Sequence, residues 1–132
     1  MSSPSSEKPL PLPCIRTRIK ICGLTREQDV DAAVAAGADA IGFVLYAPSP
    51  RAVTPQRAAE LAARLPPFVT PVLLFVNESA SNIIAASALL AGATIQFHGD
   101  ETPAECLAAT LGGARPFLRA ARIPLGDGAA RF

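Results

Sequence analysis

Three residues of the sequence combine a chemically useful side chain with a place at the end of a predicted strand or in the loop that follows it. Cys22 ends the predicted strand "RIKIC", Arg51 stands in "PSPR" and His98 stands in "QFHGDE". A thiolate can act as a nucleophile or remove a proton from carbon, a guanidinium matches the two oxygens of a carboxylate, and an imidazole can line a polar site. Each residue also has a structural interpretation: a packing cysteine, which is the commoner role at this spacing, a solvated loop arginine and a hydrogen-bonded structural histidine.

The cysteines and the histidine do not form a metal-binding pattern. The chain has 3 cysteines and 1 histidine, and Cys14, Cys22 and Cys106 show no CxxC spacing. We therefore expect neither a metal site nor a disulfide framework. Cys106 stands within an apolar helical stretch and is expected to pack in the core.

The composition is that of an ordinary globular chain. Of its 132 residues, 50% are hydrophobic and 17% are charged, and 12 Lys and Arg against 11 Asp and Glu give a net charge of +1. Without a basic block we expect no nucleic-acid partner. No apolar run reaches the roughly 18 residues that cross a bilayer, so we expect no membrane partner and a cytoplasmic location. Residues 1–17, rich in Ser and Pro, are expected to form a disordered leader.

Short β-branched runs alternate with alanine-rich stretches of helical period along the rest of the chain. Strands are predicted at residues 18–22, 38–46, 70–77, 93–99 and 115–122. Helices are predicted at residues 25–37, from 54 to the double proline at 66 and 67, at 79–90 and at 102–113, with Thr25, Thr54 and Thr102 as N-caps. Asp100 and Glu101 are expected to favour the N-terminus of the last of these helices.

This alternation predicts an α/β fold with parallel strands that are apolar on both faces and covered by helices. Five strands suffice for a doubly wound sheet, whereas an eight-stranded barrel typically takes about 250 residues, so length alone favours the doubly wound sheet. In both architectures the ligand lies at the carboxyl ends of the strands. The polar residues predicted there are Cys22, those of 46–51, Asn77, Glu78 and those of 98–101.

Four motifs together resemble phosphoribosylanthranilate isomerase, an enzyme of tryptophan biosynthesis. They are "KICGLT" at 20–25, "GADAIGFVLYAPSPRAV" at 37–53, "VLLFVN" at 72–77 and "QFHGDE" at 96–101. The resemblance implies a TIM (β/α)8 barrel, here an incomplete barrel of about five βα units over residues 18–132. It also implies an intramolecular oxidoreductase of the aldose–ketose type that acts on a small phosphorylated substrate without cofactor or metal. The implied reaction is the Amadori rearrangement of N-(5-phosphoribosyl)anthranilate to 1-(2-carboxyphenylamino)-1-deoxyribulose 5-phosphate.

The same resemblance implies roles for the three residues. Cys22, by its place in "KICGLT", matches the family's general base, and Arg51, by its place in "PSPR", matches the residue that holds the anthranilate carboxylate. His98 is given only a site-lining role. Phe97 stands where the family usually has leucine, which keeps the apolar character.

Two parts of the family pattern are not found in the sequence. The family's general acid is an aspartate that ends a sixth strand, and Asp127 has no strand leading into it, so the acid is not assigned. The phosphate-binding loops follow the seventh and eighth strands. We therefore expect the 132-residue chain alone to be inactive and to self-associate through the edges of an unclosed barrel.

Two alternatives remain open at this stage. One is a non-catalytic, five-stranded doubly wound module that binds a phosphorylated small molecule. Strand order separates it from a barrel, because a doubly wound sheet places the first strand between the second and the third. The other, ranked last for want of a paired base, is an enzyme that uses Cys22 as a nucleophile.

Overall fold

The computed structural model describes Pro9 and residues 15–126. Cys14, Asp127 and most of the predicted leader at 1–17 lie outside these residues. The described chain alternates five strands with four helices: β1 (Lys20–Cys22), α1 (Glu27–Ala35), β2 (Ala40–Val44), α2 (Pro55–Ala62), β3 (Thr70–Phe75), α3 (Ala80–Ser87), β4 (Thr94–Phe97), α4 (Pro103–Ala109) and β5 (Phe117–Arg119). Every predicted element is present, and each is shorter than predicted.

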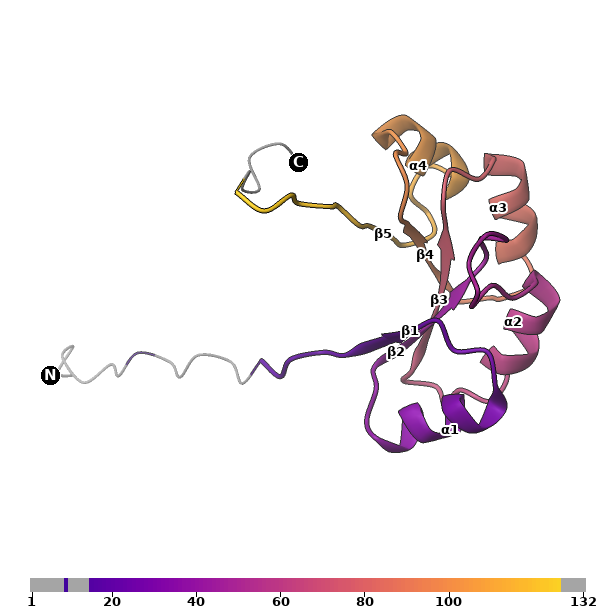
Figure 1. Cartoon of the computed structure of the whole chain (residues 1–132), viewed down its shortest axis with the longest axis vertical. Coiled ribbons are helices and arrows are strands. Elements are labelled where there is room, and N and C mark those ends of the chain that lie inside the picture. Colours follow the sequence, from indigo (N-terminus) through magenta and orange to yellow (C-terminus); the bar gives the residue numbers. More distant parts are fainter. Residues whose placement is uncertain (1–8, 10–14, 127–132) are drawn as a thin grey trace, which may run out of the picture.

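The strands pair in chain order. All four pairings are parallel, and the sheet runs β1-β2-β3-β4-β5 (Figure 1). A doubly wound sheet would place β1 between β2 and β3. The doubly wound alternative, which length alone favoured, is therefore wrong. The fold is an α/β fold in which the five strands form part of an incomplete barrel.

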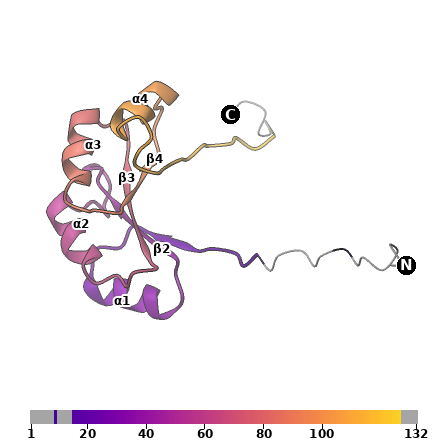
Figure 2. The same ribbon diagram turned by 180° about the vertical axis from the view of Figure 1, so that it is seen from behind.

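The helices cover one face of this sheet. Figures 1 and 2, which show the molecule from opposite sides, place all four on the same side. Among the described residues no helix lies over the other face, the arrangement expected of an unclosed barrel. The core fills the space between sheet and helices, and its largest buried side chains from the strands are Ile41, Phe43, Leu73, Ile95 and Phe97. Alternation along each strand places the residues between them on the uncovered, concave face.

Two of the three predicted N-caps are confirmed. The hydroxyl of Thr54 accepts a hydrogen bond from the backbone of Arg57 at 3.1 Å, and Thr102 forms a capping box with Glu105. Thr25 is not a cap. Arg26 is the N-cap of α1, without a capping side-chain bond, and its guanidinium instead pairs with Asp29 at 2.8 Å. No helix among the described residues is long and apolar enough to cross a membrane.

An ion pair between the first two helices makes stability depend on acid pH. Arg57 of α2 donates to both carboxylate oxygens of Glu27, at 2.6 and 3.0 Å, and this hydrogen-bonded pairing lowers the pKa of Glu27 from 4.5 to about 2. A carboxyl with a depressed pKa in the folded state stabilises the fold above its unfolded pKa and loses that contribution as the pH falls. We therefore expect chemical denaturation to show stability falling from about pH 4.5 toward pH 2.

Glu27→Gln tests that origin, because it removes the titrating group and should flatten this part of the pH profile. The fall that remains belongs to other carboxyls, chiefly Asp39, whose pKa Arg16 holds at about 2. Profiles of the same slope in variant and wild type would contradict the assignment to Glu27.

Candidate functional site

Cys22 is the last residue of β1, and its sulfur lies on the concave face. Its neighbour in register is Gly42 of β2. Ile41 and Phe43, on either side of Gly42, face the helices, so the positions of Gly42 and Cys22 face away from them. A Cβ atom added to Gly42 would lie 2.8 Å from the Sγ of Cys22. The missing side chain gives the sulfur its space. The half-buried Cys22 is thus not sealed among aliphatic core residues, in contrast to Cys106, which is 2% exposed as predicted.

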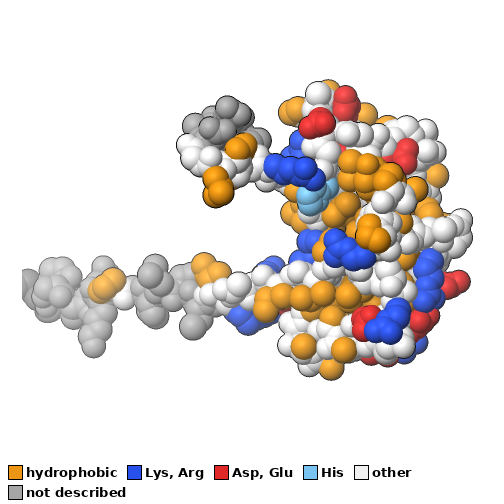
Figure 3. Space-filling view, in the orientation of Figure 1, with side chains coloured by type: hydrophobic (Ala, Val, Ile, Leu, Met, Phe, Trp, Pro, Cys, Tyr) orange, Lys and Arg blue, Asp and Glu red, His pale blue; other side chains and the backbone are white. Residues whose placement is uncertain are grey.

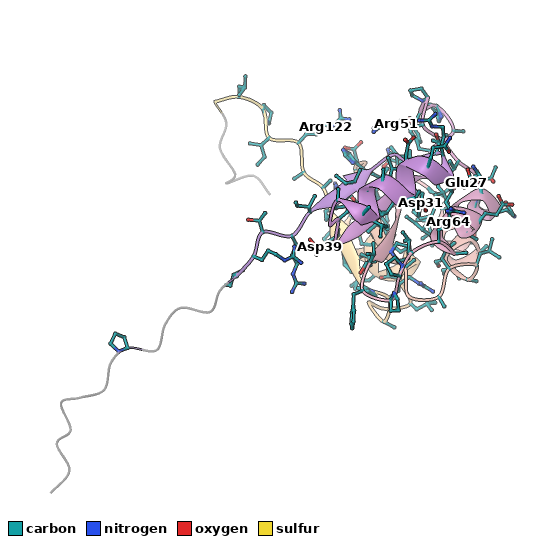
Figure 4. All side chains as sticks on the ribbon, turned by 90° about the horizontal axis from the view of Figure 1, so that it is seen from below. Glu27, Asp31, Asp39, Arg51, Arg64 and Arg122 are labelled. Atoms are coloured by element: carbon teal, nitrogen blue, oxygen red, sulfur yellow. The ribbon has the colours of Figure 1, made fainter. Side chains whose placement is uncertain are left out.

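Arg51 reaches back from the loop after β2 to the end of β1. Its Nη1 donates to the carbonyl oxygen of Cys22 at 3.2 Å. The guanidinium lies so close to Gly23 that an added Cβ atom would be 2.4 Å from Nη1 and would displace it. Gly23 also has a φ of +84°, which favours glycine. In Figure 4, Arg51 and Asp39 lie apart, beyond the two ends of β2. The structure thus joins Cys22 and Arg51, and the guanidinium stays exposed to solvent.

His98 directly follows β4 and is half-buried. Its backbone N–H donates to the carbonyl of Phe75 at 3.0 Å, which extends the pairing of β3 and β4 by one bond. Its Nδ1 is buried without a hydrogen-bond partner among the described residues. The imidazole lines a cavity of about 300 Å³ together with Asn77, Asp100 and Arg122. Figure 3 shows the histidine beside basic side chains.

A hydrogen bond between Asn77 and Glu101 connects the loops after β3 and β4. The sequence did not predict this connection. Glu101 is only 6% exposed and accepts hydrogen bonds from the backbone N–H groups of Asn77 and Gly99, at 2.9 and 2.8 Å. The carboxylate of Glu101 thus bonds to loop amides, while Thr102 and Glu105 form the capping box of α4. A glutamate one residue before a predicted cap carries no local signal of burial.

Gln96 is a second residue that sequence reasoning missed. It precedes His98 by two positions and shares its face of β4, and its Oε1 is likewise buried without a partner among the described residues. The signal was available, since a glutamine inside an apolar strand is unusual. Among the described residues no group of three or more His, Cys, Asp or Glu side chains is placed to hold a metal ion.

The polar groups therefore form two clusters at one edge of the sheet. Cys22 and Arg51 lie at the ends of β1 and β2, while Asn77, His98 and Glu101 lie at the ends of β3 and β4. The carboxyl ends of parallel strands are where (β/α)8 barrels bind their ligands. The model of the N-(5'-phosphoribosyl)anthranilate (PRA) isomerase family matches residues 19–123, which include both clusters.

The chain belongs to the phosphoribosylanthranilate isomerase family. It is 63% identical over 112 residues to the N-(5'-phosphoribosyl)anthranilate isomerase of Methylibium petroleiphilum, covering 85% of this chain and 51% of that protein. Against the enzyme of Dechloromonas aromatica it is 63% identical over 109 residues, covering 83% and 50%. The chain thus spans about half the length of these relatives. The family resemblance of the four motifs is confirmed.

Solved phosphoribosylanthranilate isomerases share the fold. A crystal structure of one in complex with reduced 1-(o-carboxyphenylamino)-1-deoxyribulose 5-phosphate superposes with a TM-score of 0.77 at 34% identity, covering 83% of this chain and 55% of that one. The Thermus thermophilus enzyme gives a TM-score of 0.74 at 34% identity, with 83% and 53% covered. The described strands and helices therefore correspond to about half of a phosphoribosylanthranilate isomerase barrel.

Proposed function

We propose that this chain supplies the general base and the carboxylate-binding arginine of a phosphoribosylanthranilate isomerase. The observation that carries the proposal is the Sγ of Cys22, which lies over Gly42 on the concave face, while the guanidinium of Arg51 donates to the backbone carbonyl of the same residue. In the Amadori rearrangement the aminoaldose opens to an imine, a base removes the proton from C2, and the resulting enol becomes the aminoketose. The thiolate of Cys22 takes that proton, while Arg51 binds the anthranilate carboxylate.

The ligand of one solved relative supports a phosphorylated small molecule as substrate. That relative was crystallised with a reduced carboxyphenylamino deoxyribulose 5-phosphate, which carries both a carboxylate and a phosphate. His98 lines the same edge of the sheet and is proposed to contact the sugar portion. The absence of a cofactor from the reaction and the cytoplasmic location remain predictions.

A hybrid enzyme tests the proposal. Residues 19–123 of this chain replace the matching segment of the Methylibium petroleiphilum enzyme, and isomerisation of N-(5-phosphoribosyl)anthranilate is followed by substrate fluorescence. We expect turnover near that of the parent enzyme. The 132-residue chain assayed alone serves as the comparison and is expected to be inactive. A folded hybrid without activity would overturn the proposal.

Replacing Arg51 in the hybrid should weaken substrate binding more than turnover. Loss of a charged hydrogen bond is worth about 1.5–3 kcal/mol, so Arg51→Ala should raise KM roughly 10- to 100-fold. Arg51→Lys should recover only part of the loss, because an ammonium cannot grip both carboxylate oxygens. Arg64→Ala is the matched control, since Arg64 pairs with Asp31 at 2.6 Å on the helix side. If steady-state kinetics gave the same KM for the unmutated hybrid and for its Arg51→Ala, Arg51→Lys and Arg64→Ala variants, the role of Arg51 would be contradicted.

We further propose that the 132-residue chain self-associates through its sheet edges. In the described sheet β1 and β5 each have one neighbour, and Ile21 and Leu118 on these strands are 37% and 46% exposed. An unpaired parallel edge with exposed apolar side chains is a template for association. Light scattering should show a mass that rises with concentration, and Leu118→Lys should reduce it. Leu111→Lys, at a residue 62% exposed in the turn after α4, should not. A wild-type chain that stays monomeric would refute the proposal.

A further inference from the structure

Glu101 is a charged residue in an almost fully buried place. It is 6% exposed, and glutamate is rarely buried unless its charge is paired and hydrogen-bonded. Both oxygens are in use: Oε2 accepts from the N–H of Asn77 at 2.9 Å and Oε1 from the N–H of Gly99 at 2.8 Å. Arg119 of β5 approaches Oε1 to 4.0 Å. The carboxylate therefore connects two loops that are far apart in sequence.

Asn77 strengthens the same connection from the other side. Its Oδ1 accepts from the backbone N–H of Asp100 at 2.9 Å. Asn77 has a φ of +51°, a conformation that asparagine tolerates better than most residues. Gly99 permits the approach, because an added Cβ atom would lie 2.5 Å from that Oδ1. Two side-chain-to-backbone hydrogen bonds thus hold the loop after β3 against the loop after β4, and the bond from Gly99 to Glu101 fixes the second loop on itself.

His98 lies inside this bonded unit. Its own N–H is fixed to the carbonyl of Phe75, and the next residue, Gly99, is fixed to Glu101. Its Nδ1 makes no hydrogen bond to a described residue, so the hydrogen bonds in this part of the chain fix the backbone on either side of the ring rather than the ring itself. One peptide unit therefore separates the Cα atom of His98 from the N–H group that Glu101 holds.

We propose that Glu101 is a positioning residue whose buried carboxylate sets the place of His98 at the carboxyl ends of β3 and β4. Charge-assisted hydrogen bonds are about twice as strong as neutral ones, which suits a carboxylate to this task. Glu101→Gln keeps the shape, but its amide nitrogen is a donor and leaves one of the two backbone N–H groups without an acceptor. Glu101→Asp keeps the charge and is one methylene too short to reach both loops.

The 132-residue chain itself allows the test, because His98 is its only histidine and its imidazole gives a single set of NMR signals. In Glu101→Gln and Glu101→Asp we expect the His98 signals to shift and broaden. Amide hydrogen exchange at Asn77 and Gly99 should rise about tenfold, the effect of losing one hydrogen bond. The amides of Leu73 and Ile95, in the core of β3 and β4, should keep their exchange rates and so report that the fold is intact.

Glu105→Gln is the matched control. Glu105 is exposed, lies four residues further along and caps α4, so the His98 signals should be those of wild type. Glu101 variants with wild-type His98 signals and wild-type exchange at Asn77 and Gly99 would overturn the proposal. If Glu101→Gln unfolds, Glu101→Asp decides by the same two measurements.

The catalytic consequence rests on the proposed isomerase activity and is measured in the hybrid enzyme. Glu101→Gln should lower kcat about tenfold with a smaller change in KM, and Glu101→Asp should restore part of the loss. Unchanged kcat in an active hybrid would overturn the positioning role in the reaction. An inactive wild-type hybrid would instead count against the proposed function, while the NMR measurements on the chain still decide whether Glu101 places His98.

Discussion

Cys22→Ser in the hybrid enzyme is expected to lower kcat by roughly 10²- to 10⁴-fold, the range typical of a lost general base, with KM nearly unchanged. Serine differs from cysteine by a single atom, so it fits the space over Gly42 that now holds the sulfur. A hydroxyl, however, is a far weaker acid than a thiol and supplies almost no anion to take the C2 proton. Arg51 and the substrate contacts stay in place. Steady-state and single-turnover kinetics measure the two constants.

Cys106→Ala is the control for a general effect of removing a thiol. Cys106 is 2% exposed inside α4, and burial raises the pKa of its thiol, so it stays protonated and takes no part in proton transfer. Its replacement should cost stability through a small cavity and leave kcat of the folded enzyme unchanged. Unchanged kcat in Cys22→Ser would return Cys22 to a packing role and remove the basis of the proposed mechanism.

The local parts of the fold could be predicted from the sequence because their causes are local. Thr54 and Thr102 each precede a proline and a helical stretch, and both cap as expected. Thr25 also precedes a helical stretch, but no proline follows it, and Arg26 takes the N-cap position instead. The apolar character of both strand faces shows that both avoid water, and it does not show whether helices or the rest of a barrel cover them.

Strand order and the clusters at the sheet edge depend on contacts between distant residues. Length favoured the wrong architecture, and only the resemblance of four motifs indicated the barrel. That same resemblance singled out Cys22 and Arg51, whose 3.2 Å contact spans a sequence separation of 29 residues. Nothing in the spacing of Asn77 and Glu101, which are 24 residues apart, revealed their bond. Such a pairing follows from the register of β3 on β4, which a single sequence does not specify.

Phe97→Ala is expected to lower the free energy of unfolding by about 3–5 kcal/mol, the usual cost of removing a buried phenylalanine. Phe97 is 1% exposed, and its ring meets that of Phe117 edge to face, with centroids 5.6 Å apart. Phe97 of β4 packs in the core between the sheet and the helices and contacts Phe117 of β5, so its loss removes both buried apolar area and a favourable ring contact. Urea denaturation measures the change in the free energy of unfolding. Both proteins are compared at the same protein concentration, because the apparent stability of a self-associating chain depends on that concentration.

Phe68→Ala separates this cost from a general effect of losing a phenyl ring. Phe68 is 98% exposed in the turn before β3, so its replacement should change the free energy of unfolding by less than about 0.5 kcal/mol. A cost below about 1 kcal/mol for Phe97→Ala would mean that the surrounding side chains collapse into the cavity. Because His98 follows Phe97 directly, that collapse would also displace the imidazole, and the His98 NMR signals of the variant would record it.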